Sequence, residues 1–175
     1  MAERYLIRWY GPRATEQLLA ECGHPNPVVR YRAAWALGKT RDPRAFEGLL
    51  RLTSDEDEGV RYDATLALGE LGDERAIPHL HRIWLEDDHT RPAGEALAKM
   101  GPRAIPAVEE ALRSESTNLR AGALNVLCAL APTGNRRVFE LLNECLNDPD
   151  PGIRTDAADQ IEEQARASRT GPDKR

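Results

Sequence analysis

Histidine and cysteine are the side chains through which this sequence could perform nucleophilic or metal-assisted chemistry, and both are few. His79 and His81 are two residues apart, so a helix would direct them to different faces and not to one metal ion. The cysteines form no CxxC pair and are typical of small hydrophobic residues in a reducing compartment. The full set is His24, His79, His81, His89, Cys22, Cys128 and Cys145. The sequence therefore predicts no catalytic residue, no metal site and no cofactor.

Carboxylates gather in two short runs, SDEDE at 54–58 and EDD at 86–88. Both runs precede a predicted helix, where acidic side chains cap free backbone amides. The sequence contains no HExxH, GxSxG, P-loop or dinucleotide-binding glycine signature. We interpret the runs as solvated turns between helices, and nothing in them favours an enzyme.

Composition limits the classes of partner. The chain has 175 residues, with 29 acidic and 24 basic side chains and a net charge of -5. This balance argues against a dedicated nucleic-acid binder, because phosphate contacts need a dense Lys/Arg surface. Its longest apolar runs are far shorter than the roughly 18 residues that span a bilayer, and the N-terminal MAERYLIRWY lacks a signal-peptide cleavage site. We expect a cytoplasmic protein without a membrane span.

The elements that position these side chains repeat along the chain. VRYRAAWALG at 29–38 realigns on VRYDATLALG at 60–69, and each copy predicts a pair of helices. One pair cannot bury its apolar face alone, so stacked pairs must share a core. We predict an all-α, right-handed solenoid of antiparallel helix pairs with about eleven helices. Its predicted parts are a half unit at 2–10, units at about 13–38, 43–69, 74–100, 103–131 and 135–165 in one domain over 1–166, and a disordered tail at 167–175.

Two local features accompany the repeat. Gly38 and Gly69 close the second helix of their copies, which predicts left-handed C-terminal caps there. The third copy departs from the pattern at Thr90 and Pro92, which predicts a local bend or a looser stack.

The repeated pattern resembles a known family. D-x-x-V-R-x-x-A-A-x-A-L-G followed by x-x-G-D-x-R-A-I-P-x-L is carried by 57–69 with 72–80, and again by 26–38 with 42–50. It resembles the HEAT repeat, and more narrowly the short HEAT-like repeat of phycobilisome lyases and many bacterial and archaeal proteins. The resemblance implies that the second helix of each pair lines a concave face. Such repeats serve many tasks, so it implies fold more than function.

An arginine recurs near the start of the second helix. We predict that it joins adjacent pairs through charge-assisted hydrogen bonds and does not bind a ligand. The four copies are Arg30, Arg61, Arg120 and Arg154, beside Asn26, Asp57, Asn118 and Asp150.

Two positions of the second helix face outward in the pattern, and in the N-terminal half they hold aromatic or apolar residues. A contiguous surface of this kind is typical of a binding site, although rings that merely cover the repeat joints would give the same pattern. We predict a non-catalytic scaffold that binds a peptide or protein partner on its concave face. The predicted contact residues are Tyr5, Tyr31, Trp35, Tyr62, Leu66, Arg91 and Glu95.

Alternatives stay open. The family resemblance allows a chromophore lyase or chaperone of the phycobilin-lyase type. A HEAT-like nucleic-acid binder is also possible, because several arginines lie near the aromatic residues: Arg30, Arg32, Arg61 and Arg91.

Two further tryptophans have structural interpretations. Trp84 aligns with an apolar helix position, which predicts a core residue. Trp9 either caps the end of the stack or forms a homodimer contact through the end helix.

Overall fold

The described residues are folded as helix pairs. The structure, a computed structural model, describes residues 14–86 and 91–169. Every regular element within those ranges is a helix, which confirms the predicted all-α fold. The predicted helix at 2–10 and the departure at Thr90 lie outside these residues. Two compact units are present, Met1–Met100 and Gly101–Arg175.

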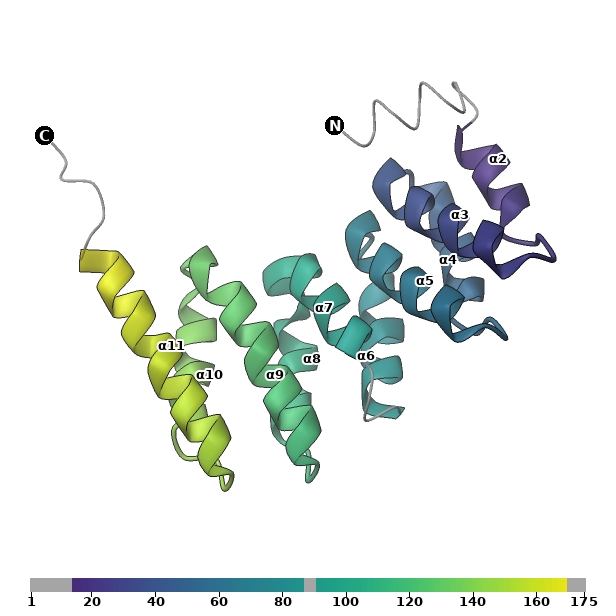
Figure 1. Cartoon of the computed structure of the whole chain (residues 1–175). Helices are drawn as coiled ribbons and strands as arrows, with labels where there is room; N and C mark the ends of the chain where they lie inside the picture. Colours follow the sequence, from purple (N-terminus) through teal and green to yellow (C-terminus); the bar gives the residue numbers. More distant parts are fainter. Residues whose placement is uncertain (1–13, 87–90, 170–175) are drawn as a thin grey trace, which may run out of the picture. The chain divides into compact units, whose positions relative to one another are not determined.

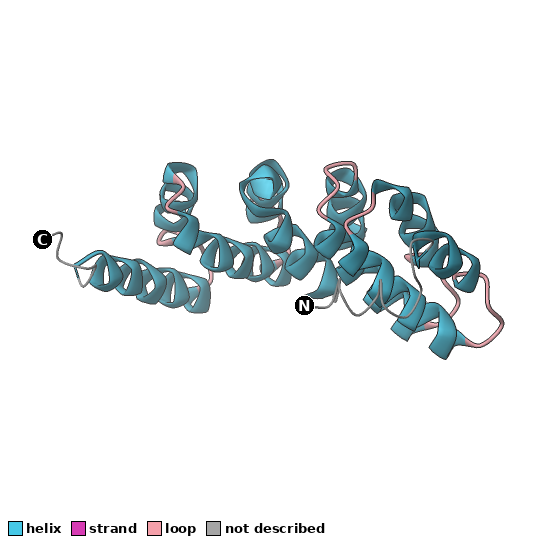
Figure 2. Ribbon diagram, turned by 90° about the horizontal axis from the view of Figure 1, so that it is seen from above, coloured by secondary structure: helices cyan, strands magenta, loops and turns pink. Residues whose placement is uncertain are grey.

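The first unit consists of two layers (Figures 1 and 2). One layer holds α3, α5 and α7, with α3 packed on α5 and α5 on α7. The other layer holds α2, α4 and α6. The bounds are α2 Ala14–Glu21, α3 Pro27–Thr40, α4 Phe46–Leu52, α5 Glu58–Leu71, α6 Ala76–Glu86 and α7 Arg91–Met100, with a 3-10 turn at Pro43–Ala45.

The second unit repeats this arrangement. Helix α9 packs on α8, and α11 packs on both α10 and α9. The bounds are α8 Ile105–Leu112, α9 Thr117–Leu130, α10 Arg136–Cys145 and α11 Pro151–Arg169, with 3-10 turns at Gly101–Ala104 and Ala131–Thr133. Helix α11 continues past residue 166, the predicted end of the repeat domain.

Helices α3, α5 and α9 each begin at a polar cap four residues before the repeated arginine. The side chains of Asn26 and Asp57 accept from the backbone N–H groups of Val28 and Val60. In α9 the cap is Ser116, which accepts from the Leu119 N–H. Asn118, which the sequence analysis named beside Arg120, lies inside α9, in its first turn.

Alanine and leucine fill the core of the first unit, and glycine brings its helices together. Leu37, Leu68 and Leu97 are fully buried. Gly38 and Gly69 lie inside α3 and α5, which continue to Thr40 and Leu71. A side chain at Gly69 would start 2.5 Å from the Ala96 Cα atom, and one at Gly38 would start 2.8 Å from the Ala67 Cα atom. These glycines permit close helix packing.

The prediction of left-handed caps at Gly38 and Gly69 was consequently wrong. The residues with positive φ that end α3 and α5 are Arg41 (φ 52°) and Gly72 (φ 74°). A helix can continue through a glycine when the neighbouring backbone occupies the space of its side chain, so a glycine near the end of an apolar stripe does not by itself mark a cap.

Aromatic side chains support the other layer. Trp84 is buried against Gly94 of α7, which confirms the predicted core position. The Arg75 guanidinium lies 4.3 Å above the centroid of the Phe46 ring and donates to the Pro43 carbonyl at 3.3 Å. This contact joins the start of α6 to the preceding helix pair.

Candidate functional site

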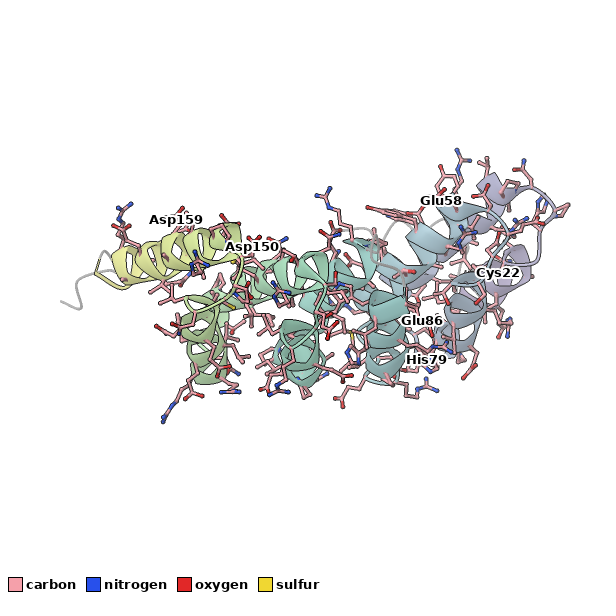
Figure 3. The ribbon with its side chains drawn as sticks, turned by 90° about the horizontal axis from the view of Figure 1, so that it is seen from below. Cys22, Glu58, His79, Glu86, Asp150 and Asp159 are labelled. Atoms are coloured by element: carbon pink, nitrogen blue, oxygen red, sulfur yellow. The ribbon has the colours of Figure 1, made fainter. Side chains whose placement is uncertain are left out.

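The three cysteine thiols are protonated, and Cys128 lies near enough to Cys145 to contribute to the raised pKa of that thiol. Figure 3 shows Cys22 near the end of α2 and His79 on α6. Burial raises the pKa of the Cys22, Cys128 and Cys145 thiols to about 11, so all three are protonated at neutral pH. Among the residues that the structure describes, no three His, Cys, Asp or Glu side chains gather to hold a metal ion. His89 lies outside them.

Arg30 joins two successive helix pairs. Its side chain donates to both carboxylate oxygens of Asp55 in the next turn, at 2.7 and 2.8 Å. It also donates to the carbonyls of His24 and Pro25 in its own turn, at 2.9 and 3.2 Å. The hydrogen bonds from Arg30 lower the pKa of Asp55 despite its burial. Arg30 is itself buried, so its side chain serves to connect the two helix pairs.

Among the described residues, Arg120 repeats the geometry of Arg30, whereas Arg61 and Arg154 donate only to carbonyls of their own turns. Arg120 donates to both oxygens of Asp148, at 2.9 and 3.1 Å, and to the carbonyls of its own turn. Arg61 and Arg154 donate to the carbonyls of Asp55 and Asp148, at 2.8 and 2.7 Å. Asp55 and Asp148 were missed in the sequence, because the turn offers several carboxylates and helical periodicity does not distinguish them.

Three exposed rings lie on two neighbouring helices. Tyr31 and Trp35 are one turn apart on α3, with 37% and 51% of their surfaces exposed, and Tyr62 on α5 is 43% exposed. Leu66, one turn after Tyr62, is half-buried. We call Tyr31, Trp35, Tyr62 and Leu66 the aromatic surface. Tyr5, the fifth predicted apolar contact, lies outside the described residues.

The aromatic surface lies on α3 and α5, which are equivalent helices that pack on each other and run in the same direction. Arg30 meets Asp55 where the two helices begin, and Lys39 meets Glu70 where they end. Tyr31 and Tyr62 therefore occupy equivalent positions on two helices that pack on each other, as do Trp35 and Leu66. The same two positions on α7 hold Arg91 and Glu95, which form an ion pair at 3.3 Å.

A row of alternating charges closes one end of the aromatic surface. Glu70 on α5 pairs with Lys39 on α3 at 2.8 Å and with Lys99 on α7. The hydrogen bonds from Lys39 and then Lys99 lower the pKa of the Glu70 carboxyl group. The row lies one turn beyond Trp35, Leu66 and Glu95. We did not predict it, although its signal is present as opposite charges at equivalent repeat positions.

Three of the four equivalent positions in the second unit are polar, and the fourth is the half-buried Ala121. Asn125, Thr155 and Asp159 are exposed, and Asp159 is labelled on α11 in Figure 3. The Thr155 hydroxyl donates to the Pro151 carbonyl at 2.9 Å. Within the described residues, the exposed aromatic rings at these positions are thus confined to the first unit.

Comparison with protein families identifies the repeat. Residues 15–98 match the family of HEAT repeats. This part of the chain is therefore similar to HEAT repeats. The match covers α2 to most of α7, and hence every described residue of the aromatic surface. No curated protein matches the chain.

Solved structures extend the similarity in fold to most of the chain. The complex of CpcE and CpcF of phycocyanin lyase from Nostoc sp. PCC7120 is 24% identical, with a TM-score of 0.56 over 91% of this chain and 68% of that one. The archaeal HEAT-like repeats protein from Thermococcus onnurineus NA1 is 18% identical, with a TM-score of 0.57 over 94% and 75%.

A designed armadillo repeat protein in complex with the peptide (KR)4 is 18% identical, with a TM-score of 0.54 over 91% of this chain and 84% of that one. The fold is therefore that of a helical repeat solenoid. None of the helices within residues 14–86 and 91–169 combines the length and apolar character that a bilayer crossing requires.

Proposed function

We propose that this chain is a non-catalytic scaffold whose HEAT repeats bind a segment of a protein partner on the α3–α5–α7 layer. The observation that carries the proposal is the exposure of Tyr31, Trp35 and Tyr62 on two neighbouring helices. Only 5% of the residues are aromatic, so three exposed rings on one surface are a large share of them. Tyrosine and tryptophan bury much apolar area on binding and lose little conformational entropy.

The charged residues around the aromatic surface support the same proposal. Arg91 and Glu95 pair with each other, and Lys39, Glu70 and Lys99 form the row at its end. An apolar centre with a polar rim is the usual anatomy of a protein interface. The designed armadillo protein of similar fold is an example of a helical repeat that holds a peptide. By the family resemblance, the α3–α5–α7 layer would line the concave face.

The nucleic-acid alternative receives less support from the same residues. Arg30 is buried in its pairing with Asp55, and Arg61 donates to the carbonyls of Asp55 and Glu56. Arg91 is paired with Glu95. Of the four arginines that favoured this alternative, only Arg32 is exposed without an ion pair, and phosphate binding depends on several free cations.

The proposal is tested with the double variant Trp35→Ala/Tyr62→Ala and the matched control Leu146→Ala. Leu146 is also an exposed apolar residue, but it follows α10 in the second unit. We expect wild type and the control to capture the same proteins from a lysate, and the double variant to lose at least one of them. Titration of that purified protein should give a Kd at least tenfold weaker for the double variant, because hot-spot rings contribute about 2 kcal/mol each.

Circular dichroism must show equal helicity for all three proteins. Equal capture and equal Kd values for the double variant and the control would refute the proposal. Loss of binding in Leu146→Ala alone would place the interface on the second unit.

A further inference from the structure

Asp63 is a carboxylate without a partner beside the aromatic surface. It follows Tyr62 on α5 and is half-buried, yet its side chain makes no hydrogen bond or ion pair with the described residues. Burial alone raises the pKa of its carboxyl group above the usual value. Neighbouring carboxylates behave differently, since Asp55 is paired with Arg30 and Glu70 with Lys39.

Helical periodicity places Asp63 at the seam between α3 and α5. Asp63 precedes Ala67 by one turn, so both lie on the same side of α5. Ala67 packs on Gly38 of α3. Tyr31 and Trp35 precede Gly38 by about two turns and one turn, on the α3 side of the same contact. The carboxylate of Asp63 and the rings of Tyr31 and Trp35 therefore border one seam.

The cations around this seam leave Asp63 available. Lys39 is occupied by Glu70, which lies two turns beyond Asp63 on the same side of α5. Arg91 on α7 is occupied by Glu95. Arg32 holds the position on α3 that is equivalent to Asp63, and its guanidinium forms no ion pair with the Asp63 carboxylate.

We propose that the α3–α5 seam accepts a lysine or arginine side chain of the partner, with Asp63 as its ion-pair acceptor and Tyr31 and Trp35 as its aromatic walls. This inference rests on the proposed function and names the chemistry that the partner must present. A cation next to a carboxylate and an aromatic face gains both a charge-assisted hydrogen bond and a cation–π contact. An anionic side chain at the same place would be repelled by Asp63.

The unpaired state of Asp63 supports a role in binding. A half-buried carboxylate without a partner disfavours the folded state, because water is removed from the charge and nothing replaces it. Residues that oppose stability in this way gather at functional sites. A cation from a partner would replace the favourable interactions with water that the Asp63 carboxylate loses on burial. The same loss of hydration therefore destabilises the free protein and favours binding of the cation.

Two synthetic peptides of equal length test the inference. One alternates lysine and glycine over eight residues, the other alternates acetyl-lysine and glycine, and both carry a fluorescent label for anisotropy. We expect wild type to bind the lysine peptide at least tenfold more tightly than the acetylated peptide. In Asp63→Asn, which keeps the shape and removes the charge, the affinity for the lysine peptide should fall about tenfold.

Asp159→Asn is the matched control, because Asp159 is an exposed aspartate at an outward position of the second unit. It changes the net charge of the protein equally and should alter the Kd less than twofold. Arg32→Gln should leave binding unchanged, since Arg32 forms no ion pair with Asp63.

Equal weakening in Asp63→Asn and Asp159→Asn would overturn the inference, because it would mean a general effect of net charge. So would an unchanged Kd in Asp63→Asn, or loss of binding in Arg32→Gln. These failures are distinct from failure of the proposed function. If Trp35→Ala/Tyr62→Ala still loses its captured protein while Asp63→Asn retains it, the surface binds a partner but does not select a cation.

Discussion

Two aspartates at the start of α5 meet opposite environments. Asp55 accepts two hydrogen bonds from Arg30, which lower the pKa of its carboxyl group, whereas Asp63 accepts none and has its pKa raised by burial. Asp55 is thereby a stabilising residue at neutral pH, and Asp63 is a destabilising one. At the scale of single residues, Asp55 connects two helix pairs, whereas Asp63 lies unpaired beside the aromatic surface.

The cost of Asp63 predicts a measurable gain in stability when its charge is removed. A raised folded-state pKa means that the folded chain binds the proton more readily, so stability falls as the pH rises from the ordinary carboxyl pKa through the raised value. We expect Asp63→Asn to increase the free energy of unfolding at pH 7 by up to about 0.5 kcal/mol, measured by urea denaturation. The gain should vanish below the ordinary pKa of 3.8. A loss of stability at pH 7 would show that Asp63 has a partner in the free protein.

At the scale of elements, glycine sets the distance between equivalent helices. Gly38 lies against Ala67 and Gly69 against Ala96, so α3 contacts α5, and α5 contacts α7, through one glycine and one alanine. This close approach lets Glu70 reach cations on both neighbouring helices. The packing of α3, α5 and α7 therefore depends on the small residues at their contacts.

Substitution of Gly69 tests this packing. A methyl group there would overlap the Ala96 backbone, which cannot move without displacing α7, so Gly69→Ala should lower the free energy of unfolding by about 1–3 kcal/mol. The control is Gly23→Ala, because the nearest atom to a side chain at Gly23 is 3.9 Å away. Thermal unfolding followed by circular dichroism compares the two. Similar melting temperatures for both variants would mean that the seam has room for a side chain.

At the scale of the molecule, paired carboxylates connect successive helix pairs within both units. The pKa of each is lowered by its cation: Asp55 by Arg30, Glu70 by Lys39, Glu109 by Arg137 and Asp148 by Arg120. The same chemical link thus recurs along the stack. Because neighbouring repeats stabilise one another, loss of these links affects the cooperativity of the whole array.

Acid should therefore unfold the chain through these joints. A lowered pKa contributes stability above the ordinary carboxyl values of 3.8 for Asp and 4.5 for Glu, and this stability is lost as the pH falls below them. We expect the melting temperature to be at least about 5 °C lower at pH 3 than at pH 7. In Asp55→Asn/Asp148→Asn the difference between the two pH values should shrink. An undiminished difference in this variant would assign the acid sensitivity to other groups.

Much of the fold was predictable because the repeat can be recognised from the spacing of apolar residues along the chain. The recurrence of VRYRAAWALG as VRYDATLALG indicated helix pairs, and the same pattern placed Trp84 in the core and Trp35 outside it. The candidate surface could be predicted in part, since Tyr31, Trp35 and Tyr62 are exposed. The hand of the solenoid, its concave face, its single domain and its partner remain predictions.

The sequence by itself determined which residues of each helix face inward and which face outward, since helical periodicity depends only on neighbours along the chain. Only the tertiary structure decided which atoms meet across a seam. In the folded chain Arg30 pairs with Asp55, and Lys39 and Lys99 pair with Glu70. Gly38 and Gly69 lie at helix contacts and are not caps, and Asp63 has no cation as a partner. The register between two helices follows from the packing of small residues against backbone, and periodicity within one helix carries no information about it.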